Sequence, residues 1–251
     1  MTVKQHYDNH LAVYYSWMAG DFELKRKEFE SFLEKNLVKP ASTKIAIDLG
    51  SGHGIQSVAL SNLGFEVTAI DLSKQLLSEL ETNSEGKPIK TIRDDIRQIE
   101  KYKNLNPELI LCFGDTITHL DSVDDINEFI ENCAHTLCDG GKFIVSFRNY
   151  TEEVTGNQRF IPVKSDEDRI LTCFLEYEAK RVTVTDLFHE KTGQGWVQKV
   201  SSYHKVRIGP KDIIRIFEKN RMRIIFYESL SGMQTIIAEK QKIGSYRINQ
   251  G

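Results

Sequence analysis

The chain has 251 residues, which fits one large domain or a domain that carries an insert. Hydrophobic residues make up 40% and charged residues 27%, with only 5 prolines, so disordered and low-complexity classes are excluded. The 33 Lys and Arg residues against 36 Asp and Glu leave a net charge of -3, which argues against broad nucleic-acid binding. No apolar run approaches the roughly 20 residues that span a bilayer. The N-terminus has no apolar signal core and the four cysteines have no C-x-x-C spacing, so we expect a cytoplasmic protein with reduced thiols and no metal site.

The first part of the chain alternates between helix-like and strand-like runs. Residues 5–37 have apolar side chains at helical spacing, with a break expected at 19–21. The runs that follow are, in chain order, strand 44–49, helix 56–63, strand 65–70, helix 73–82, strand 89–93, strand 109–113, helix 122–137 and strand 142–147. Ser73 is in position to cap the second of these helices. This alternation predicts an α/β fold, with a parallel sheet covered by helices on both faces.

The pattern changes after residue 150. Four strand-like runs with turn signals between them and no helix follow, at 159–163, 169–178, 181–190 and 196–208. They predict an antiparallel insert, after which a helix at 211–220 and strands at 223–228 and 234–238 close the chain. We therefore divide the chain into N-terminal helices 1–37, an α/β core 38–150, a β insert 151–208 and a C-terminal part of the core 209–251.

The segment Ile47–Gly54, with the sequence IDLGSGHG, joins the first strand of the core to a helix. Gly50, Gly52 and Gly54 let the backbone turn sharply and approach a ligand closely, and the helix N-terminus offers free N–H groups. Asp71, at the end of the second strand, is placed to accept hydrogen bonds from both ribose hydroxyls. Glycine turns also occur for structural reasons, but the strand, the helix and the acid together predict a bound adenosine cofactor.

Three features favour S-adenosylmethionine over NAD as this cofactor. In a dinucleotide site the glycines read G-x-G-x-x-G, and here the third glycine falls one residue early. Asp48 precedes the first glycine by two residues, where a carboxylate faces a cationic amino group better than a pyrophosphate. Asp95 and Ile96 follow the third strand and offer an acceptor for the adenine amino group and a backbone N–H for the ring. The closing antiparallel strand pair points the same way.

With these motifs the chain resembles the class I S-adenosylmethionine-dependent methyltransferases over essentially its whole length, and most of all the glycine N-methyltransferase group. The segment LCFGDTITHL (Leu111–Leu120) is similar to that group's C-L-G-N-S-x-x-H-L, and FRNY (Phe147–Tyr150) matches its R-N-Y. Tyr7-Asp8 and Gly20-Asp21 resemble its N-terminal helix. The resemblance implies a Rossmann-like seven-stranded methyltransferase sheet, mostly parallel with an antiparallel C-terminal strand pair, and an antiparallel insert that roofs the active site.

Carried over residue by residue, the resemblance implies a set of cofactor contacts. They are Tyr15, Lys25, Asp48, Gly50, Ser51, Gly52, Asp71, Leu72, Asp95, Ile96 and Phe113. In this set Lys25 is the basic partner of the methionine carboxylate. For the substrate the resemblance implies Tyr7, Arg148 and Tyr203. Arg148 matches the arginine that holds the substrate carboxylate in the glycine enzymes, a task that suits a planar guanidinium, and the alternative is a pairing with a surface acid.

The chain departs from the group's pattern at several positions. Asp115 stands where the group has an asparagine, which exchanges a neutral group for a charged acceptor. Two tyrosines of the group's insert fall on Val163 and Asp186. These changes add acids and remove hydroxyls, so we expect a larger or more cationic amine in place of glycine. The alternative is that Asp115 only caps its loop, because Asp is a common turn residue.

The chemistry asks the protein mainly to align a neutral nucleophile with the methyl group. His119, on the loop after the fourth strand, is the candidate base, with a structural role as its alternative. Asp115 is the second candidate catalytic residue. The aromatic side chains of the N-terminal helix, such as Tyr15 and Trp17, either close the site or belong to the core.

The sequence thus predicts methyl transfer from S-adenosylmethionine to a small molecule, first of all to the nitrogen of an amine or amino acid. A small-molecule O-methyltransferase stays open, because the same fold hosts that activity. A non-catalytic S-adenosylmethionine-binding module is the alternative of another class, and it predicts cofactor binding without turnover. We expect no nucleic-acid or membrane partner, and the resemblance suggests a homo-oligomer formed through the N-terminal segment.

Overall fold

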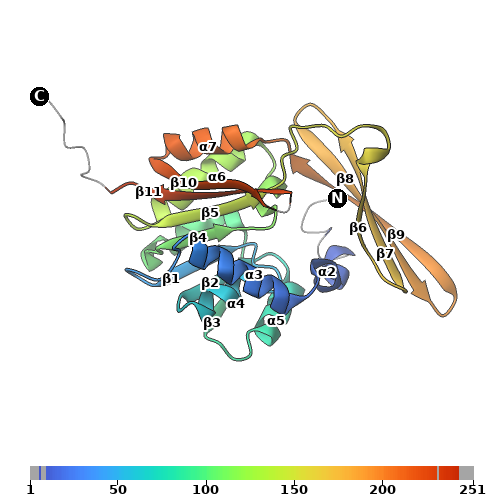
Figure 1. Ribbon diagram of the computed structural model, residues 1–251, viewed down its shortest axis with the longest axis horizontal. Helices are drawn as coiled ribbons and strands as arrows, with labels where there is room; N and C mark the ends of the chain where they lie inside the picture. The colour runs from blue at the N-terminus through green and yellow to red at the C-terminus, as the bar shows by residue number, and fades with distance from the viewer. Residues whose placement is uncertain (1–5, 7–9, 231, 243–251) are drawn as a thin grey trace, which may run out of the picture.

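The computed structural model describes residues 6, 10–230 and 232–242. A seven-stranded sheet with helices on both faces forms the larger part, and a separate four-stranded antiparallel sheet stands to one side of it (Figure 1). The predicted fold class is confirmed. No helix within the described ranges is long and apolar enough to cross a membrane.

The large sheet has the strand order β10-β11-β5-β4-β1-β2-β3. Its strands are β1 Ile45–Leu49, β2 Glu66–Asp71, β3 Ile89–Arg93, β4 Leu109–Cys112, β5 Lys142–Phe147, β10 Met222–Leu230 and β11 Met233–Lys240. Strands β1 to β5 are parallel, whereas β11 runs antiparallel to both β5 and β10. The strand order reverses at β1, which lies between β2 and β4, and ligands of such sheets bind at the carboxyl ends of the strands at this point.

The helices occur close to where the apolar spacing predicts them. They are α2 Ala12–Ala19, α3 Phe22–Lys35, α4 Ile55–Asn62, α5 Lys74–Asn83, α6 Val123–Thr136 and α7 Pro210–Lys219. Gly20, with φ of 94°, separates α2 from α3, and the hydroxyl of Ser73 caps α5 by accepting from the Leu76 N–H. Three short 3-10 segments were not predicted: η2 Ile96–Leu105, η3 Thr116–His119 and η4 Gly156–Arg159. The longest of them, η2, packs every third residue against the core, a spacing that differs from the α-helical period. These residues are Ile96, Ile99, Tyr102 and Leu105.

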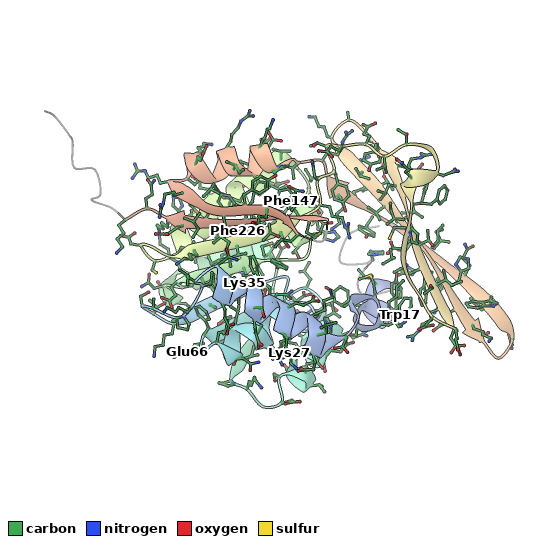
Figure 2. The ribbon with its side chains drawn as sticks, viewed as in Figure 1. Trp17, Lys27, Lys35, Glu66, Phe147 and Phe226 are labelled. Carbon is green, nitrogen blue, oxygen red and sulfur yellow. The ribbon has the colours of Figure 1, made fainter. Side chains whose placement is uncertain are left out.

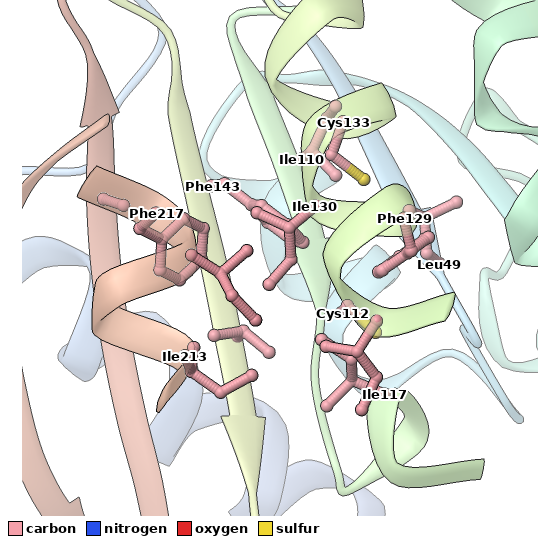
Figure 3. Packing of buried hydrophobic residues seen from close by; sticks show 14 of the residues in the cluster. Leu49, Ile110, Cys112, Ile117, Phe129, Ile130, Cys133, Phe143, Ile213 and Phe217 are labelled. Atoms are coloured by element: carbon pink, nitrogen blue, oxygen red, sulfur yellow. The ribbon is translucent and has the colours of Figure 1, made fainter. Parts of the chain in front are cut away.

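Strands β1, β4 and β5 in the middle of the large sheet are buried on both faces, which explains why they are apolar almost throughout. On one face, Phe129 of α6 and Phe217 of α7 pack against Phe143 of β5 (Figure 3). On the other face, Phe29 and Leu33 of α3 pack with α4 and β1. These two layers hold the strand ends in fixed positions.

The small sheet has the order β6-β7-β8-β9, with β6 Phe160–Ser165, β7 Arg169–Tyr177, β8 Arg181–Thr192 and β9 Gly195–Val206. Alternate residues of β8 are buried, and Phe188 among them stacks on Tyr14 of α2 at 4.3 Å between ring centroids. Trp17, at the small-sheet side of the molecule in Figure 2, donates from Nε1 to Asp166 Oδ2 at 2.6 Å. Helix α2 is therefore the support on which the small sheet rests.

Candidate functional site

A cavity of about 1170 Å³ lies between the carboxyl ends of the parallel strands and the small sheet. Its floor comes from the loops after β1, β2, β3, β4 and β5, and its roof from strands β6 to β9. Helix α2 contributes Tyr15 and Met18 to the wall. Ligand pockets usually measure about 300–1,000 Å³, so this cavity has room for two small molecules side by side.

The glycine loop forms one part of the floor. Gly50 and Gly52 have φ of 74° and 53°, a left-handed conformation that favours glycine. A Cβ on Gly50 would lie 2.4 Å from Thr116 Cγ2, and a Cβ on Gly52 would lie 3.2 Å from the Tyr15 hydroxyl oxygen. The backbone of the loop can therefore come this close to its neighbours only because side chains are missing there.

Asp71 lies beside the glycine loop with 8% of its surface exposed. Its Oδ2 accepts from the Gly52 N–H at 2.9 Å and its Oδ1 accepts from the Ser73 N–H at 2.8 Å. Burial raises the pKa of Asp71, and these N–H donors oppose the rise. Each carboxylate oxygen keeps a further lone pair for a ligand, because a carboxylate offers about four acceptor positions.

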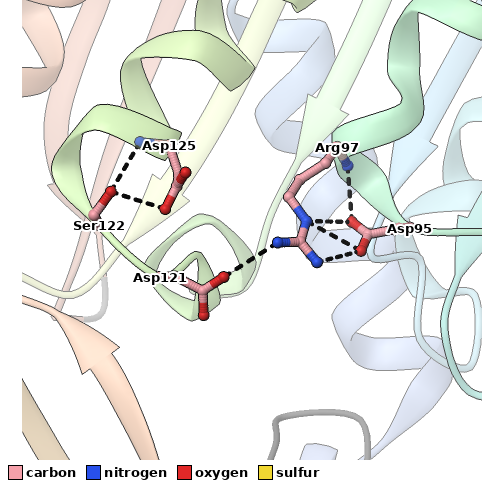
Figure 4. A network of polar contacts seen from close by, with 5 residues as sticks. All are labelled: Asp95, Arg97, Asp121, Ser122 and Asp125. Carbon is pink, nitrogen blue, oxygen red and sulfur yellow. Dashed lines mark hydrogen bonds and ion pairs between the residues drawn. The ribbon is translucent and has the colours of Figure 1, made fainter.

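Asp95, after β3, belongs to a polar network at the same end of the cavity (Figure 4). Arg97 donates to it from Nε at 3.1 Å to each oxygen and from Nη2 at 2.6 Å to Oδ2, while Arg97 Nη1 lies 3.1 Å from Asp121 Oδ2. Burial alone would raise the pKa of Asp95, but the hydrogen bonds from Arg97 bring it below its usual value. The network links the loop after β3 to the loop after β4.

Asp115 organises the other half of the floor. It has φ of 71° and is 7% exposed. Its Oδ1 accepts from the Arg148 backbone N–H at 2.9 Å and from the Thr118 hydroxyl at 2.8 Å, and its Oδ2 accepts from the Tyr150 hydroxyl at 2.8 Å. Lys205 Nζ lies 3.0 Å from Asp115 Oδ2 and donates to the Asp115 carbonyl at 2.9 Å. The carboxylate is thus held on all sides by groups of this chain.

The pKa values around Asp115 follow from this packing. Burial raises the pKa of Tyr150 well above its usual value and the Asp115 charge adds to the rise, so Tyr150 stays a protonated donor. Burial lowers the pKa of the Lys205 ammonium, and Asp115 opposes that change. Burial and the Lys205 charge lower the pKa of His119 far below its usual value, so its imidazole is neutral at pH 7.

A second buried acid, Asp186, lies in the roof. Its Oδ2 accepts from the Tyr14 hydroxyl at 3.3 Å and its Oδ1 from the Cys173 thiol at 3.0 Å, while His6 Nε2 lies 3.4 Å from Oδ2. The ring of Tyr203 lies 4.2 Å from that of His6 and so covers this cluster. The roof is therefore polar around Asp186 of β8, and the carboxylate of Asp186 is held by the side chains of this cluster.

Comparison with known proteins shows which family the core belongs to. Residues 46–141, which hold β1 to β4 with the glycine loop and α6, match the family described as a methyltransferase domain. The core is a class I S-adenosylmethionine-dependent methyltransferase domain. The recognition made from the motifs is confirmed.

Three relatives show how far this likeness extends. A glycine/sarcosine N-methyltransferase of Aphanothece halophytica is 28% identical over 115 residues, which cover 45% of this chain and 43% of that protein. A ubiquinone biosynthesis O-methyltransferase of Xanthomonas axonopodis is 32% identical over 117 residues, covering 45% of this chain and 46% of that one. The solved CcbJ methyltransferase of Streptomyces caelestis is 16% identical with a TM-score of 0.77, and covers 95% of this chain and 99% of that one, which shows a shared fold. The chain spans less than half the length of these two curated relatives.

The residues of the methyltransferase domain fit S-adenosylmethionine. Gly50 and Gly52 line the cavity with bare backbone, and Asp71 is fixed beside them with lone pairs to spare. Leu72 and Ile96 line the same half of the cavity as apolar surfaces suited to a planar base. The hydrogen-bonded pair of Asp95 and Arg97 also lines this half of the cavity.

The structure brings most of the residues predicted from the methyltransferase motifs to one cavity. Those that line it are Tyr15, Gly50, Gly52, Asp71, Leu72, Asp95, Ile96, Asp115, His119, Arg148 and Tyr203. Tyr7 lies outside the described residues. Lys25, Asp48, Ser51 and Phe113 are not among the lining residues. The contacts themselves stay predictions.

The four exceptions have physical reasons. Lys25 is on the solvent side of α3, where its Nζ lies 3.0 Å from Glu28, so the expected contact with a methionine carboxylate is not supported. Phe113 turns its ring into the core below, 4.9 Å from that of Phe29. Asp48 lies beneath the glycine loop and accepts from the Ser57 hydroxyl at 2.6 Å, and Ser51 is buried in the loop.

Sequence reasoning missed two side chains that shape the methyltransferase cavity. Lys205 lies in a strand-like run and was not singled out from the sequence. The alternation of side chains along β9 puts it on the same face as Tyr203, which was predicted to bind substrate. Arg97 follows Asp95 by two residues, a spacing that lets an arginine fold back onto the acid. Charged residues at inward positions of a strand were the available signal for the lysine.

Proposed function

We propose that the chain transfers the methyl group of S-adenosylmethionine to a small molecule, with the amine nitrogen of an amino acid as the first acceptor class. The observation that carries this proposal is one continuous cavity that joins the glycine loop to a second, roofed half. Because reactants held in one enclosed site react as if at very high concentration, such a cavity suits a two-substrate transfer.

The glycine-loop half would hold the cofactor. Bound S-adenosylmethionine supplies an activated methyl group. Asp71 would bind the ribose, Asp95 and Ile96 the adenine, and Tyr15 would cover the loop from α2. The chain's own contribution there is to fix the direction in which the methyl group points.

The roofed half would hold the acceptor. The guanidinium of Arg148 lines the cavity, and among the described residues no acid forms an ion pair with it. It is therefore able to donate two parallel hydrogen bonds to a substrate carboxylate. The Asp115 charge, in contrast, is matched by Lys205, so the expectation of a more cationic amine loses its main support.

His119 would orient the acceptor rather than strip it of a proton. Its neutral imidazole accepts a hydrogen bond from a substrate N–H, but its low pKa makes it a weak base. The amine would then enter the cavity already neutral or release its proton to water. This assigns to His119 a positioning role at the reacting nitrogen.

The test is transfer of a labelled methyl group to a panel of glycine, sarcosine, larger amino acids, cationic amines and hydroxy acids. We expect transfer to nitrogen of amino acids, and Arg148→Gln should raise the KM of carboxylate-bearing acceptors by roughly tenfold to a hundredfold, as for the loss of a charged hydrogen bond. The matched control is Arg215→Gln, at an exposed arginine of α7. Transfer to hydroxy acids alone would favour the O-methyltransferase, and cofactor binding without any transfer would favour the binding module.

A further inference from the structure

Lys205 joins the two sheets of the protein. It lies on β9 of the small sheet, yet its ammonium group touches Asp115 in the loop after β4 of the large sheet, at both a side-chain oxygen and the carbonyl. Only 4% of Lys205 is exposed. A buried ion pair is kept only where good geometry and further hydrogen bonds compensate for the lost hydration, and this one has both.

The pair determines the charge that a ligand meets in the roofed half. Asp186 is held by the Tyr14 hydroxyl and the Cys173 thiol with His6 facing it, and Asp115 is matched by Lys205. Arg148 is therefore a cation of the roofed half without an acid partner among the described residues. If Lys205 did not match the Asp115 charge, a bound carboxylate would meet one more unmatched acid beside this arginine.

The same pair also fixes the place of Arg148. The Asp115 oxygen Oδ1 accepts from the Arg148 backbone N–H, and Oδ2 is held by Lys205 and Tyr150. The orientation of the carboxylate, and with it the start of the loop after β5, thus depends on a lysine from the roof.

We propose that Lys205 is the specificity-determining residue of the roofed half: by pairing with Asp115 it keeps the cavity selective for acceptors that carry a carboxylate. This inference rests on the proposed function. Lys205 acts through Asp115 and Arg148, so it is a positioning residue. The apolar side chains of Ile161, Leu175 and Val184 line the same half and suit an acceptor with an apolar body.

The test compares two probes that differ only by the carboxylate, phenylalanine and phenethylamine. Their dissociation constants are measured by titration calorimetry on the full chain saturated with S-adenosylhomocysteine. The wild type is expected to bind phenylalanine more tightly. Lys205→Met should lower this preference roughly tenfold or more, as for one unit charge acting over about 10 Å at an effective dielectric constant of about 20.

The two partners of the ion pair give opposite outcomes. Asp115→Asn leaves the Lys205 cation unmatched and should increase the preference for phenylalanine, and the Lys205→Met/Asp115→Asn double variant should return it toward the wild-type value. A merely structural role would shift both single variants in the same direction. The control is Lys199→Met, on the same face of β9 but paired with Glu190 at the exposed end of the hairpin, which should leave the preference unchanged.

If Lys205→Met does not fold, the double variant compared with Asp115→Asn still isolates the lysine, because it leaves no unmatched charge. Equal shifts in both single variants, no shift in either, or a wild type that binds phenethylamine as well as phenylalanine or binds neither probe would overturn the inference. Failure of the proposed function is seen separately, as a wild type that does not bind S-adenosylhomocysteine at all.

Discussion

Four acidic side chains lie at the carboxyl end of the large sheet, three of them buried and Asp95 half-buried, and each is held by particular partners. Asp71 accepts from backbone N–H groups, Asp95 from an arginine and Asp115 from a lysine and two hydroxyls. Asp48 differs, because it is 1% exposed and one of its oxygens accepts from the neutral Ser57 hydroxyl. Of these four carboxylates, Asp48 therefore has the least hydrogen-bond and charge stabilisation of its ionised form.

This difference predicts a pH dependence of stability. Burial, with the Asp71 charge adding to it, raises the pKa of Asp48 from 3.8 to about 7, although the Ser57 hydroxyl opposes the rise. Between those values the folded chain holds a proton that the unfolded chain has lost, so the contribution of this group is complete below pH 3.8 and disappears as the pH rises to about 7. Asp48→Asn should remove the resulting fall in the free energy of unfolding between pH 5 and roughly 7.5, measured by urea denaturation. A slope that persists in this variant would assign the effect to another group.

Single residues were predictable from the sequence where a motif fixes their backbone position. Asp71 and Asp95 follow strands, and Arg148 follows β5, so each had to lie at the same edge of the sheet. Lys205 could not be found this way, because it meets Asp115 across 90 residues and between two sheets. Lys25 does not line the cavity, because a sequence match fixes a place on a helix but not the direction in which a long side chain points.

The glycine loop is the element on which the cofactor half depends. Gly50 combines a left-handed backbone with a Thr116 side chain that leaves no room for a Cβ. Thr116 in turn is held by a hydrogen bond of 3.0 Å to the Phe113 carbonyl, so it does not move away freely. The glycine loop therefore packs closely against η3 and the end of β4.

Gly50→Ala tests this fit against a matched control. Gly86 has φ of 79°, close to that of Gly50, but a Cβ there would meet nothing within 4 Å. Both variants should lose about 1–2 kcal/mol of stability from left-handed backbone strain. Only Gly50→Ala should also weaken the binding of S-adenosylhomocysteine, by roughly tenfold or more on the scale of a lost hydrogen-bonded contact. Equal affinities of the two variants would contradict the close fit.

At the level of elements, the sequence predicted both the buried central strand β5 and the half-exposed edge strand β3. The expected spans of β3 and β5 agree with the structure to the residue, and all four strands of the small sheet were anticipated from alternation and turns. The 3-10 segments were not predicted because two of them have only four residues and the third, η2, follows a three-residue spacing instead of the α-helical period.

The whole molecule consists of a conventional α/β core and a β roof (Figure 1), and the two together line the cavity of about 1170 Å³. The separation into two sheets follows from the change of pattern after β5, but their relative placement does not. It depends on contacts between distant segments, such as Tyr14 with Phe188 and Lys205 with Asp115. These contacts hold the small sheet over the carboxyl ends of the parallel strands.

The central claim is that the glycine-loop half of this cavity binds S-adenosylmethionine. Titration calorimetry of the full chain with S-adenosylhomocysteine tests it most directly. One molecule should bind per chain, Asp71→Asn should weaken binding roughly tenfold or more through the lost charged hydrogen bonds to the ribose, and Asp139→Asn, at an exposed acid outside the cavity, should not. Absence of binding in the wild type, or equal affinities of Asp71→Asn and wild type, would contradict the account.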